Sequence, residues 1–259
     1  MNNRKEILSA FDRLLTIMDE LREGCPWDRK QTMESLRHLT IEETFELADA
    51  ILDGDLEEVK KELGDITLHM VFYAKIASEK QVFDMGHVLH SVCDKLVERH
   101  PHIYGDVNAD SEEEVKANWE KIKLGDKQNR SVLDGVPRSL PSMVKAFRTQ
   151  EKARGVGFDW DKADLAWEKV REEFGEFEAE QVNGTAADRE AEFGDLLFSL
   201  INYARLAGIN PDSALERTNK KFIHRFQSME KQAAAAGKNL YDLSLDEMEV
   251  LWTKSKRLD

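Results

Sequence analysis

The stretch IEETFELADAILDGDLEEVKKELGDITLHM, residues Ile41–Met70, contains the clearest structural pattern of the chain. It carries two pairs of carboxylates, and the members of each pair are three residues apart: Glu43 with Glu46, and Glu62 with Asp65. Residues at this spacing lie on one face of an α-helix. Gly54 predicts a turn between the pairs, and both pairs are symmetric about it. An antiparallel helical hairpin therefore places Glu43 opposite Asp65 and Glu46 opposite Glu62, so that four carboxylates converge on one point.

The same pattern occurs a second time in REEFGEFEAEQVNGTAADREAEFGDLLFSL, residues Arg171–Leu200, which aligns on the first stretch without a gap. The four carboxylates recur at matching positions, as Glu173, Glu176, Glu192 and Asp195. Gly184 aligns with Gly54 at the turn. A single EExxE or ExxD pattern on a helix is usually a solvated acidic face. The repetition about a matching turn argues against that interpretation and indicates two related halves.

The composition excludes several classes of protein. The chain has 259 residues, enough for two domains, and 41% of them are hydrophobic. A net charge of −14 argues against binding to the phosphate backbone of nucleic acids. Two cysteines are too few for a disulfide framework and favour a reducing compartment. The N-terminus lacks the apolar core of a signal peptide, and no apolar run is long enough to span a membrane. We expect a cytoplasmic protein with no nucleic-acid or membrane partner.

Helical periodicity covers most of the chain, and strand signals are nearly absent. The predicted helices are about Lys5–Glu23, Met33–Leu52, Leu56–Ser78, Gly86–Arg99, Ser111–Ile122, Ser142–Ala153, Lys162–Val182, Ala186–Leu206, Pro211–Ala236 and Asp246–Arg257. Pro101 is expected to close the fourth of these, and the stretch 124–141 contains two of the five prolines and little periodicity. We predict an all-α fold with two tandem related helical-bundle domains, 1–125 and 142–259, joined by a linker at 126–141.

Smaller features also recur in both halves. Trp27-Asp28 resembles Trp160-Asp161, and each is expected in a short loop. Lys95–Arg99 resembles Lys221–Arg225, and the Trp119 region resembles the Trp252 region. Lysines and arginines of these segments could neutralise a polyphosphate, and Trp160 or Trp252 could stack on a base. Taken alone, such lysines are more often surface charges and such tryptophans are as often packing residues.

Four carboxylates at one point repel one another, and a divalent cation is the usual resolution. Oxygen ligands without a histidine or cysteine partner favour Mg²⁺, with Mn²⁺ as a substitute, over Zn²⁺. The Glu-x-x-His motif of di-iron bundles is missing. His69 lies four residues after Asp65, but the second half has Ser199 at that position. His100 and His102 flank Pro101 without second-half equivalents, so a structural role is favoured for them.

The chain resembles the MazG family of nucleoside triphosphate pyrophosphohydrolases over nearly its whole length. CPWDRKQTMESLRHLTIEETFELADAI (Cys25–Ile51), ELGD (Glu62–Asp65), ERHPHIYGD (Glu98–Asp106) and VGFDW (Val156–Trp160) are similar to that family's motifs. The EExxE…ExxD spacing is shared by the wider all-α NTP pyrophosphatase group. The resemblance implies the reaction of an NTP or dNTP with water to give NMP or dNMP and diphosphate. It also implies Mg²⁺, broad base tolerance, a homodimer and a role in cleaning the nucleotide pool.

The resemblance also assigns site residues, mainly in the second half, which it implies is the main catalytic domain. The implied metal ligands are Glu173, Glu176, Glu192 and Asp195, with a second set at Glu43, Glu46, Glu62 and Asp65. The implied nucleotide-binding residues are Lys169, Val170, Arg171, Glu172, Glu173, Lys221, Phe222, Ile223, His224, Arg225, Trp252 and Lys254. A carboxylate near the ions, Glu172 or Glu176, is expected to accept a proton from the attacking water.

Three other functions stay open at this point. One is a narrower nucleotide pyrophosphatase, for example one acting on dUTP. Another is a nucleotide-binding regulatory protein that acts through a protein partner with little turnover, since one copy of a duplicated domain can retain binding and lose chemistry. The third is a purely structural helical dimer, in which Mg²⁺ would affect neither nucleotide binding nor thermal stability.

Overall fold

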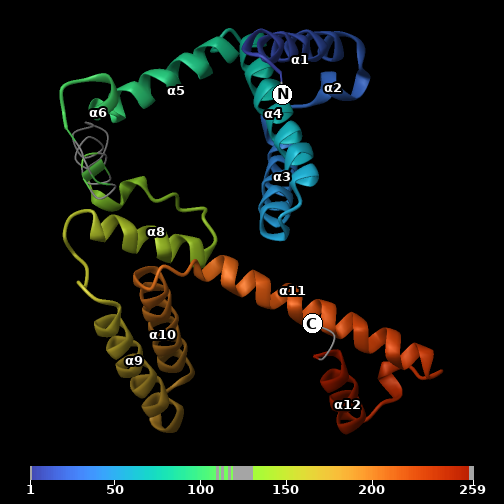
Figure 1. Ribbon diagram of the computed structural model, residues 1–259, viewed down its shortest axis with the longest axis vertical. Helices are drawn as coiled ribbons and strands as arrows, with labels where there is room; N and C mark the ends of the chain where they lie inside the picture. The colour runs from blue at the N-terminus through green and yellow to red at the C-terminus, as the bar shows by residue number, and fades with distance from the viewer. Residues whose placement is uncertain (1, 109–110, 112–113, 116–117, 119–130, 257–259) are drawn as a thin grey trace. The chain divides into compact units, whose positions relative to one another are not determined.

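The computed structural model describes residues 2–108, 111, 114–115, 118 and 131–256, and every secondary-structure element in those ranges is helical (Figure 1). This confirms the predicted all-α class. The chain divides into two compact units, Met1–Val115 and Lys116–Asp259. The predicted helix around Trp119, the predicted boundary at 125–126 and the last residues of the C-terminal helix lie outside the described residues.

The first unit is built on a helical hairpin of α3 (Met33–Asp53) and α4 (Leu56–Glu79). This unit also contains α1 (Arg4–Gly24), α2 (Pro26–Lys30), α5 (Met85–Arg99) and α6 (Pro101–Tyr104). Helix α1 packs on α4. The core between these helices contains Met18, Leu36 and the α4 residues Val71, Phe72 and Ile76. These apolar residues recur at helical spacing, which is why the hairpin and α1 bury one continuous stripe.

Local sequence explains where the first hairpin turns. The side chain of Thr32 caps α3 by accepting a hydrogen bond from the Ser35 amide, and Asp55 caps α4 by accepting from the amides of Glu57 and Glu58. Gly54 ends α3 with a φ of 71°, in the left-handed region that favours glycine. The predicted turn at Gly54 is therefore found where the sequence places it.

Two short helices differ from the sequence prediction. Trp27-Asp28 lies in α2, where we expected a loop, because Pro26 occupies the first helical position and its fixed φ favours helix. Pro101, which we expected to end the preceding helix, also starts α6 for the same reason. Within the expected linker, Val132–Gly135 forms the 3₁₀-helix η1.

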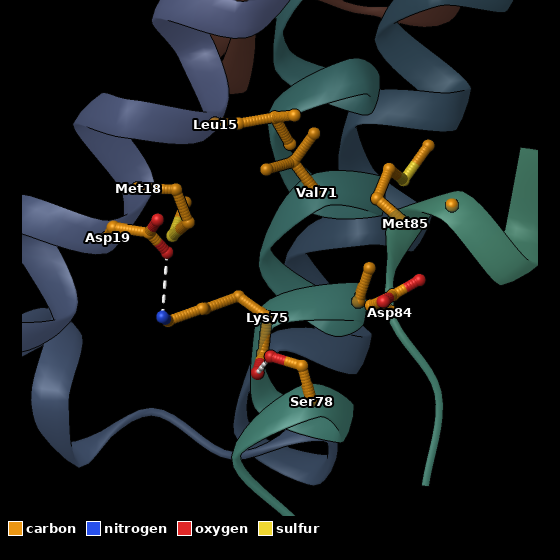
Figure 2. Close-up of a pocket in the computed structure, with 10 residues that line it drawn as sticks. Leu15, Met18, Asp19, Val71, Lys75, Ser78, Asp84 and Met85 are labelled. Atoms are coloured by element: carbon orange, nitrogen blue, oxygen red, sulfur yellow. Dashed lines mark hydrogen bonds and ion pairs between the residues drawn. The ribbon is translucent and has the colours of Figure 1, made fainter. Parts of the chain in front are cut away.

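The first unit contains an open cavity of about 290 Å³ between α1, α4 and the start of α5 (Figure 2). Leu15, Met18 and Val71 form its apolar wall. Lys75 reaches across to Asp19, and their nitrogen and oxygen atoms are 2.6 Å apart. The residues that line this cavity do not include the predicted carboxylates.

The second unit repeats the hairpin with α9 (Ala163–Asn183) and α10 (Ala186–Leu206). It also contains α8 (Ser142–Arg154), α11 (Pro211–Ala235), the 3₁₀-helix η2 (Leu240–Asp242) and α12 (Leu245–Ser255). Helix α9 runs through Gly175 without a break, although this glycine is a weak helix former. Thr185 caps α10 through the Asp188 amide. Gly184 has a φ of −81°, so the second turn does not use the left-handed conformation of Gly54.

Candidate metal and nucleotide site

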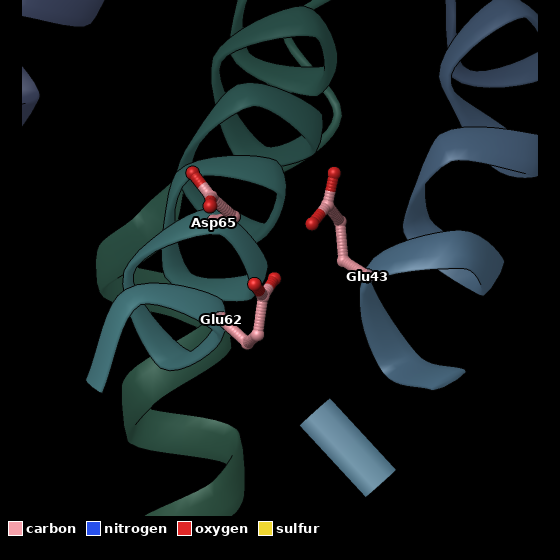
Figure 3. A group of neighbouring side chains, drawn as sticks. All are labelled: Glu43, Glu62 and Asp65. Carbon is pink, nitrogen blue, oxygen red and sulfur yellow. The ribbon is translucent and has the colours of Figure 1, made fainter. Parts of the chain in front are cut away.

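The first hairpin brings together carboxylates from both of its helices (Figure 3). Glu43 on α3 and Glu62 and Asp65 on α4 each offer an oxygen, and these atoms lie within 4.8 Å of one another. We call these three residues the N-terminal triad. Glu46, which we expected to complete the cluster, is exposed and is not part of this group. Three of the four predicted carboxylates therefore converge in the first half.

Glu62 is the deepest member of the N-terminal triad, with 1% of its surface exposed. Its Oε1 accepts a hydrogen bond from Lys61 Nζ at 2.9 Å. Lys61 also binds Glu58 at 2.9 Å, so it bridges the buried carboxylate to an exposed one. The other Glu62 oxygen, Oε2, is buried and has no hydrogen-bond partner within the described part of the chain. A buried carboxylate oxygen without a partner is costly unless a cation or proton binds it.

The pKa values of two members of the N-terminal triad, Glu43 and Glu62, are shifted in opposite directions. Burial raises the pKa of Glu43, and the neighbouring carboxylates Glu62 and Asp65 raise it further. The Lys61 ammonium lowers the pKa of Glu62 against the opposing effect of burial. The same contact raises the pKa of Lys61. Of these two glutamates, Glu43 therefore holds a proton more readily, and a bound cation would release that proton.

The second hairpin forms a corresponding group from Glu173 and Glu176 on α9 and Glu192 on α10, again with oxygens within 4.8 Å. We call these residues the C-terminal triad. Asp195 is exposed and is not part of this group. The two halves thus differ in which predicted carboxylate lies outside the triad. It is Glu46 in the first half and Asp195 in the second.

Lysine also neutralises part of the C-terminal triad. Lys169 Nζ lies 2.7 Å from Glu173 Oε1 and 2.7 Å from Glu172 Oε1. These hydrogen bonds, first to Glu172 and then to Glu173, raise the pKa of Lys169. Burial raises the pKa of Glu192, and the charges of Glu176 and other nearby carboxylates add to the effect. Glu192 Oε2 is buried without a hydrogen-bond partner among the residues described.

Both triads fit a divalent cation by the chemistry of their donors. Each offers three carboxylates at short range, and each has one buried oxygen that no described residue satisfies. Hard cations such as Mg²⁺ bind oxygen donors and retain open positions for water and phosphate.

The sequence analysis missed Lys61. The only sequence signal for its contact with Glu58 is their spacing of three residues.

The predicted nucleotide-binding residues on α11 and α12 come together. The Phe222 ring lies 5.1 Å from the Trp252 ring, measured between centroids. The Arg225 guanidinium lies over the Trp252 ring at 5.9 Å from its centroid, a cation–π geometry. Lys221, Ile223, His224 and Lys254 are exposed on the same two helices. These helices therefore present a mixed aromatic and basic surface.

The predicted nucleotide-binding segment on α9, residues 169–173, contains both buried and exposed side chains. Lys169 and Glu173 contact each other, as described above. Val170 is buried, with 6% of its surface exposed, so its side chain belongs to the core of the hairpin. Arg171 is exposed. Only part of this segment can therefore present side chains to a ligand.

Comparison with known proteins then identifies the family. The family description "MazG nucleotide pyrophosphohydrolase domain" matches residues 31–104, which include the N-terminal triad. The nucleoside triphosphate pyrophosphohydrolase of Escherichia coli K12 is 41% identical over 258 residues, covering 96% of this chain and 98% of that protein. The chain belongs to the MazG family of nucleoside triphosphate pyrophosphohydrolases.

One further relative of this MazG-family chain matches nearly its whole length, and one solved structure matches less than half of it. The nucleoside triphosphate pyrophosphohydrolase/pyrophosphatase MazG of Thermotoga maritima is 39% identical, covering 97% of this chain and 98% of that protein. The crystal structure of a mazG-related protein from Thermotoga maritima is 28% identical, with a TM-score of 0.39, and covers 43% of this chain and 97% of that one.

Among the described residues, no helix is both long and apolar enough to cross a membrane.

Arginine side chains anchor the tryptophan segments of both halves of this MazG-family chain. Arg205 of α10 donates to both carboxylate oxygens of Asp159, at 2.9 and 2.5 Å, and so fixes the loop that carries Trp160. In the first half, Arg22 of α1 pairs with Glu79 and also donates to the Asp28 carbonyl beside Trp27. Sequence reasoning missed both arginines, because their carboxylate partners, Glu79 and Asp159, are distant in the chain and follow no local spacing.

Proposed function

We propose that the chain hydrolyses nucleoside and deoxynucleoside triphosphates to the monophosphate and diphosphate, with Mg²⁺ as cofactor, Mn²⁺ as a substitute, and broad base tolerance. The observation that carries this proposal is the pair of carboxylate triads, each with a buried oxygen that lacks a partner among the described residues. Membership of the MazG family supports the reaction. A role in removing aberrant nucleotides from a cytoplasmic pool, without nucleic-acid or membrane partners, is part of the same proposal.

The residues that would hold the cation are the members of each triad. In the C-terminal half these are Glu173, Glu176 and Glu192, and a rotation of Asp195 would add the fourth ligand that the sequence predicts. Glu46 would add the corresponding ligand in the N-terminal half. When bound, the cation would activate a water and offset charge on the leaving diphosphate. We assign the main activity to the second half.

Other residues of the second half would bind and orient the nucleotide. Glu176 is the better candidate for accepting the proton of the attacking water, because Glu172 is paired with Lys169. Lys221 and Arg225 would neutralise the triphosphate. The Trp252 and Phe222 rings would contact the base by stacking, which every base permits, and broad tolerance follows from that.

We also propose that the chain is a homodimer. Both hairpins expose apolar side chains that a monomer leaves in water, among them Phe45 at 60% and Leu63 at 51% in the first half. The second half exposes Phe174 at 49%, Phe193 at 48% and Phe198 at 45%. Patches of this kind on adjacent helices mark interaction surfaces. Packing a hairpin against its copy would bury them in a four-helix arrangement.

Product analysis on a panel of NTPs and dNTPs with Mg²⁺ tests the proposal. The wild type is compared with Glu43→Gln and Glu173→Gln, which keep side-chain size and remove charge. The matched control is Glu178→Gln, an exposed glutamate of α9 outside the triad. We expect monophosphate and diphosphate from the wild type and the control, and a loss of at least about a hundredfold in Glu173→Gln.

The alternative results separate the competing functions. If the products are a nucleoside diphosphate and orthophosphate, the proposed cleavage position is wrong. Hydrolysis of dUTP alone would identify a narrower enzyme. Tight nucleotide binding without product would favour a regulatory protein that acts through a partner. Equal loss of activity in Glu43→Gln and Glu173→Gln would contradict the assignment of the main activity to the second half.

A further inference from the structure

His69 is a buried histidine next to the N-terminal triad that the proposed reaction does not use. It lies on α4 with 8% of its surface exposed. Its Nδ1 is buried and has no hydrogen-bond partner anywhere in the described ranges. Burial lowers its pKa, and the nearby charge of Asp65 opposes this. Imidazole nitrogens buried in proteins normally have a partner, so the unsatisfied Nδ1 requires an explanation.

The register of the hairpin places His69 on the same face as the triad. Helices α3 and α4 meet at two levels, where Glu43 lies near Asp65 and where Thr40 Oγ1 is 2.6 Å from the Tyr73 hydroxyl. His69 lies on α4 between these levels, one turn after Asp65 and one turn before Tyr73. Side chains on a helix lean toward its N-terminus, and Asp65 lies in that direction from His69.

The second half has no nitrogen at the equivalent position. Ser199 occupies it on α10, is also buried, and donates its hydroxyl to the Leu196 carbonyl at 2.8 Å. The serine is therefore satisfied within its own helix. The equivalent positions of the two hairpins thus differ: an unsatisfied imidazole lies one turn after Asp65 in the first half, and a satisfied hydroxyl lies one turn after Asp195 in the second.

We propose that His69 supplies a nitrogen ligand to a cation held by Glu43, Glu62 and Asp65, so that the N-terminal site prefers Mn²⁺ and related transition metals while the C-terminal site prefers Mg²⁺. This inference rests on the proposed cation sites. The imidazole is not among the groups that lie within 4.8 Å of one another, so coordination requires its side chain to rotate toward Asp65. Mixed nitrogen and oxygen donors favour transition metals, and oxygen donors alone favour Mg²⁺.

The test is electron spin echo spectroscopy of Mn²⁺ bound to the full chain, because the modulation reports a directly coordinated nitrogen. The Glu173→Gln background removes a ligand of the C-terminal site, so that the remaining Mn²⁺ reports the N-terminal site. We expect nitrogen coupling in this background, its loss on adding His69→Ser, and its retention on adding His90→Ser. His90 is an exposed histidine of α5 and serves as the matched control.

Equilibrium binding supplies a second measurement on the same proteins. We expect His69→Ser to weaken Mn²⁺ binding at the N-terminal site by about tenfold to a hundredfold, with little change in Mg²⁺ binding. The reciprocal variant Ser199→His, in a Glu43→Gln background, is expected to introduce nitrogen coupling at the C-terminal site. Circular dichroism of each variant establishes that the helical fold is retained.

The outcomes separate this inference from the proposed function. Mn²⁺ bound at the N-terminal triad without nitrogen coupling would overturn the role of His69 and leave the cation sites in place. Binding that is unaffected by Glu43→Gln and Glu173→Gln together would overturn the cation sites themselves. If His69→Ser weakens the binding of Mn²⁺ and of Mg²⁺ equally, its effect is structural, and the inference is overturned.

Discussion

At the scale of single residues, the raised pKa of Glu192 makes the stability of the protein depend on pH. Burial and nearby carboxylates raise this pKa above the ordinary 4.5. The folded state then binds a proton more tightly than the unfolded state, so this residue lowers the free energy of unfolding as pH rises from 4.5 through the raised pKa. A bound cation reverses the sign, because it requires the ionised carboxylate.

The resulting prediction is that Glu192→Gln stabilises the protein in EDTA, by an amount that grows as pH rises above 4.5 and then levels off. With saturating Mg²⁺ the same change is expected to destabilise it. Urea unfolding at a series of pH values measures both effects, and the difference from wild type removes contributions from other groups such as His69. Glu178→Gln is the control. A difference that does not change with pH in EDTA would contradict the electrostatic origin.

At the scale of elements, the two hairpin turns have matching glycines that serve different physical purposes. Gly54 has a φ of 71°, and a Cβ added there would meet nothing within 4 Å. Its requirement is therefore conformational. Gly184 lacks a positive φ, but an added Cβ would lie 2.8 Å from the Glu180 carbonyl oxygen and 2.9 Å from the Glu180 Cβ. Glycine is therefore required at position 184 because a larger residue would clash with Glu180.

Substitution by alanine and by asparagine distinguishes these two requirements. We expect Gly54→Ala to destabilise the protein by about 1 kcal/mol and Gly54→Asn by less, because asparagine tolerates the left-handed region. We expect Gly184→Ala and Gly184→Asn to destabilise it to a similar extent, because both add the clashing Cβ. Thermal unfolding of the four variants measures this. Equal tolerance of alanine and asparagine at Gly54 would contradict the conformational explanation.

At the scale of the whole molecule, the proposed homodimer depends on the apolar surface of the hairpins. Phe193, Leu197 and Leu200 of α10 are 48%, 43% and 37% exposed, and their spacing places them along one side of the helix. We expect Leu197→Asp to shift the protein from dimer toward monomer, measured by light scattering after gel filtration. Val182→Asp, at the 81% exposed end of α9, is the control and is expected to leave the mass unchanged. A monomeric wild type would refute the dimer.

The hairpins themselves were predictable because helix formation depends on local spacing. Apolar residues recur every three to four positions, and the carboxylate pairs share that period, so both helices and the turn at Gly54 follow from the sequence. Short helices were not predictable in the same way. Trp27-Asp28 lies in α2 because of a single proline at its first position, and such local effects compete closely with loop formation.

The helical class, the duplication, the two groups of carboxylates and the family were thus predictable from the amino-acid sequence. Only the tertiary structure decided which carboxylates meet: Glu46 stays outside the first triad, whereas Asp195 stays outside the second. It also revealed the Lys61 and Lys169 contacts and the unsatisfied Nδ1 of His69. The physical reason is that helical spacing assigns residues to a face, whereas burial and distances between side chains depend on how two helices pack.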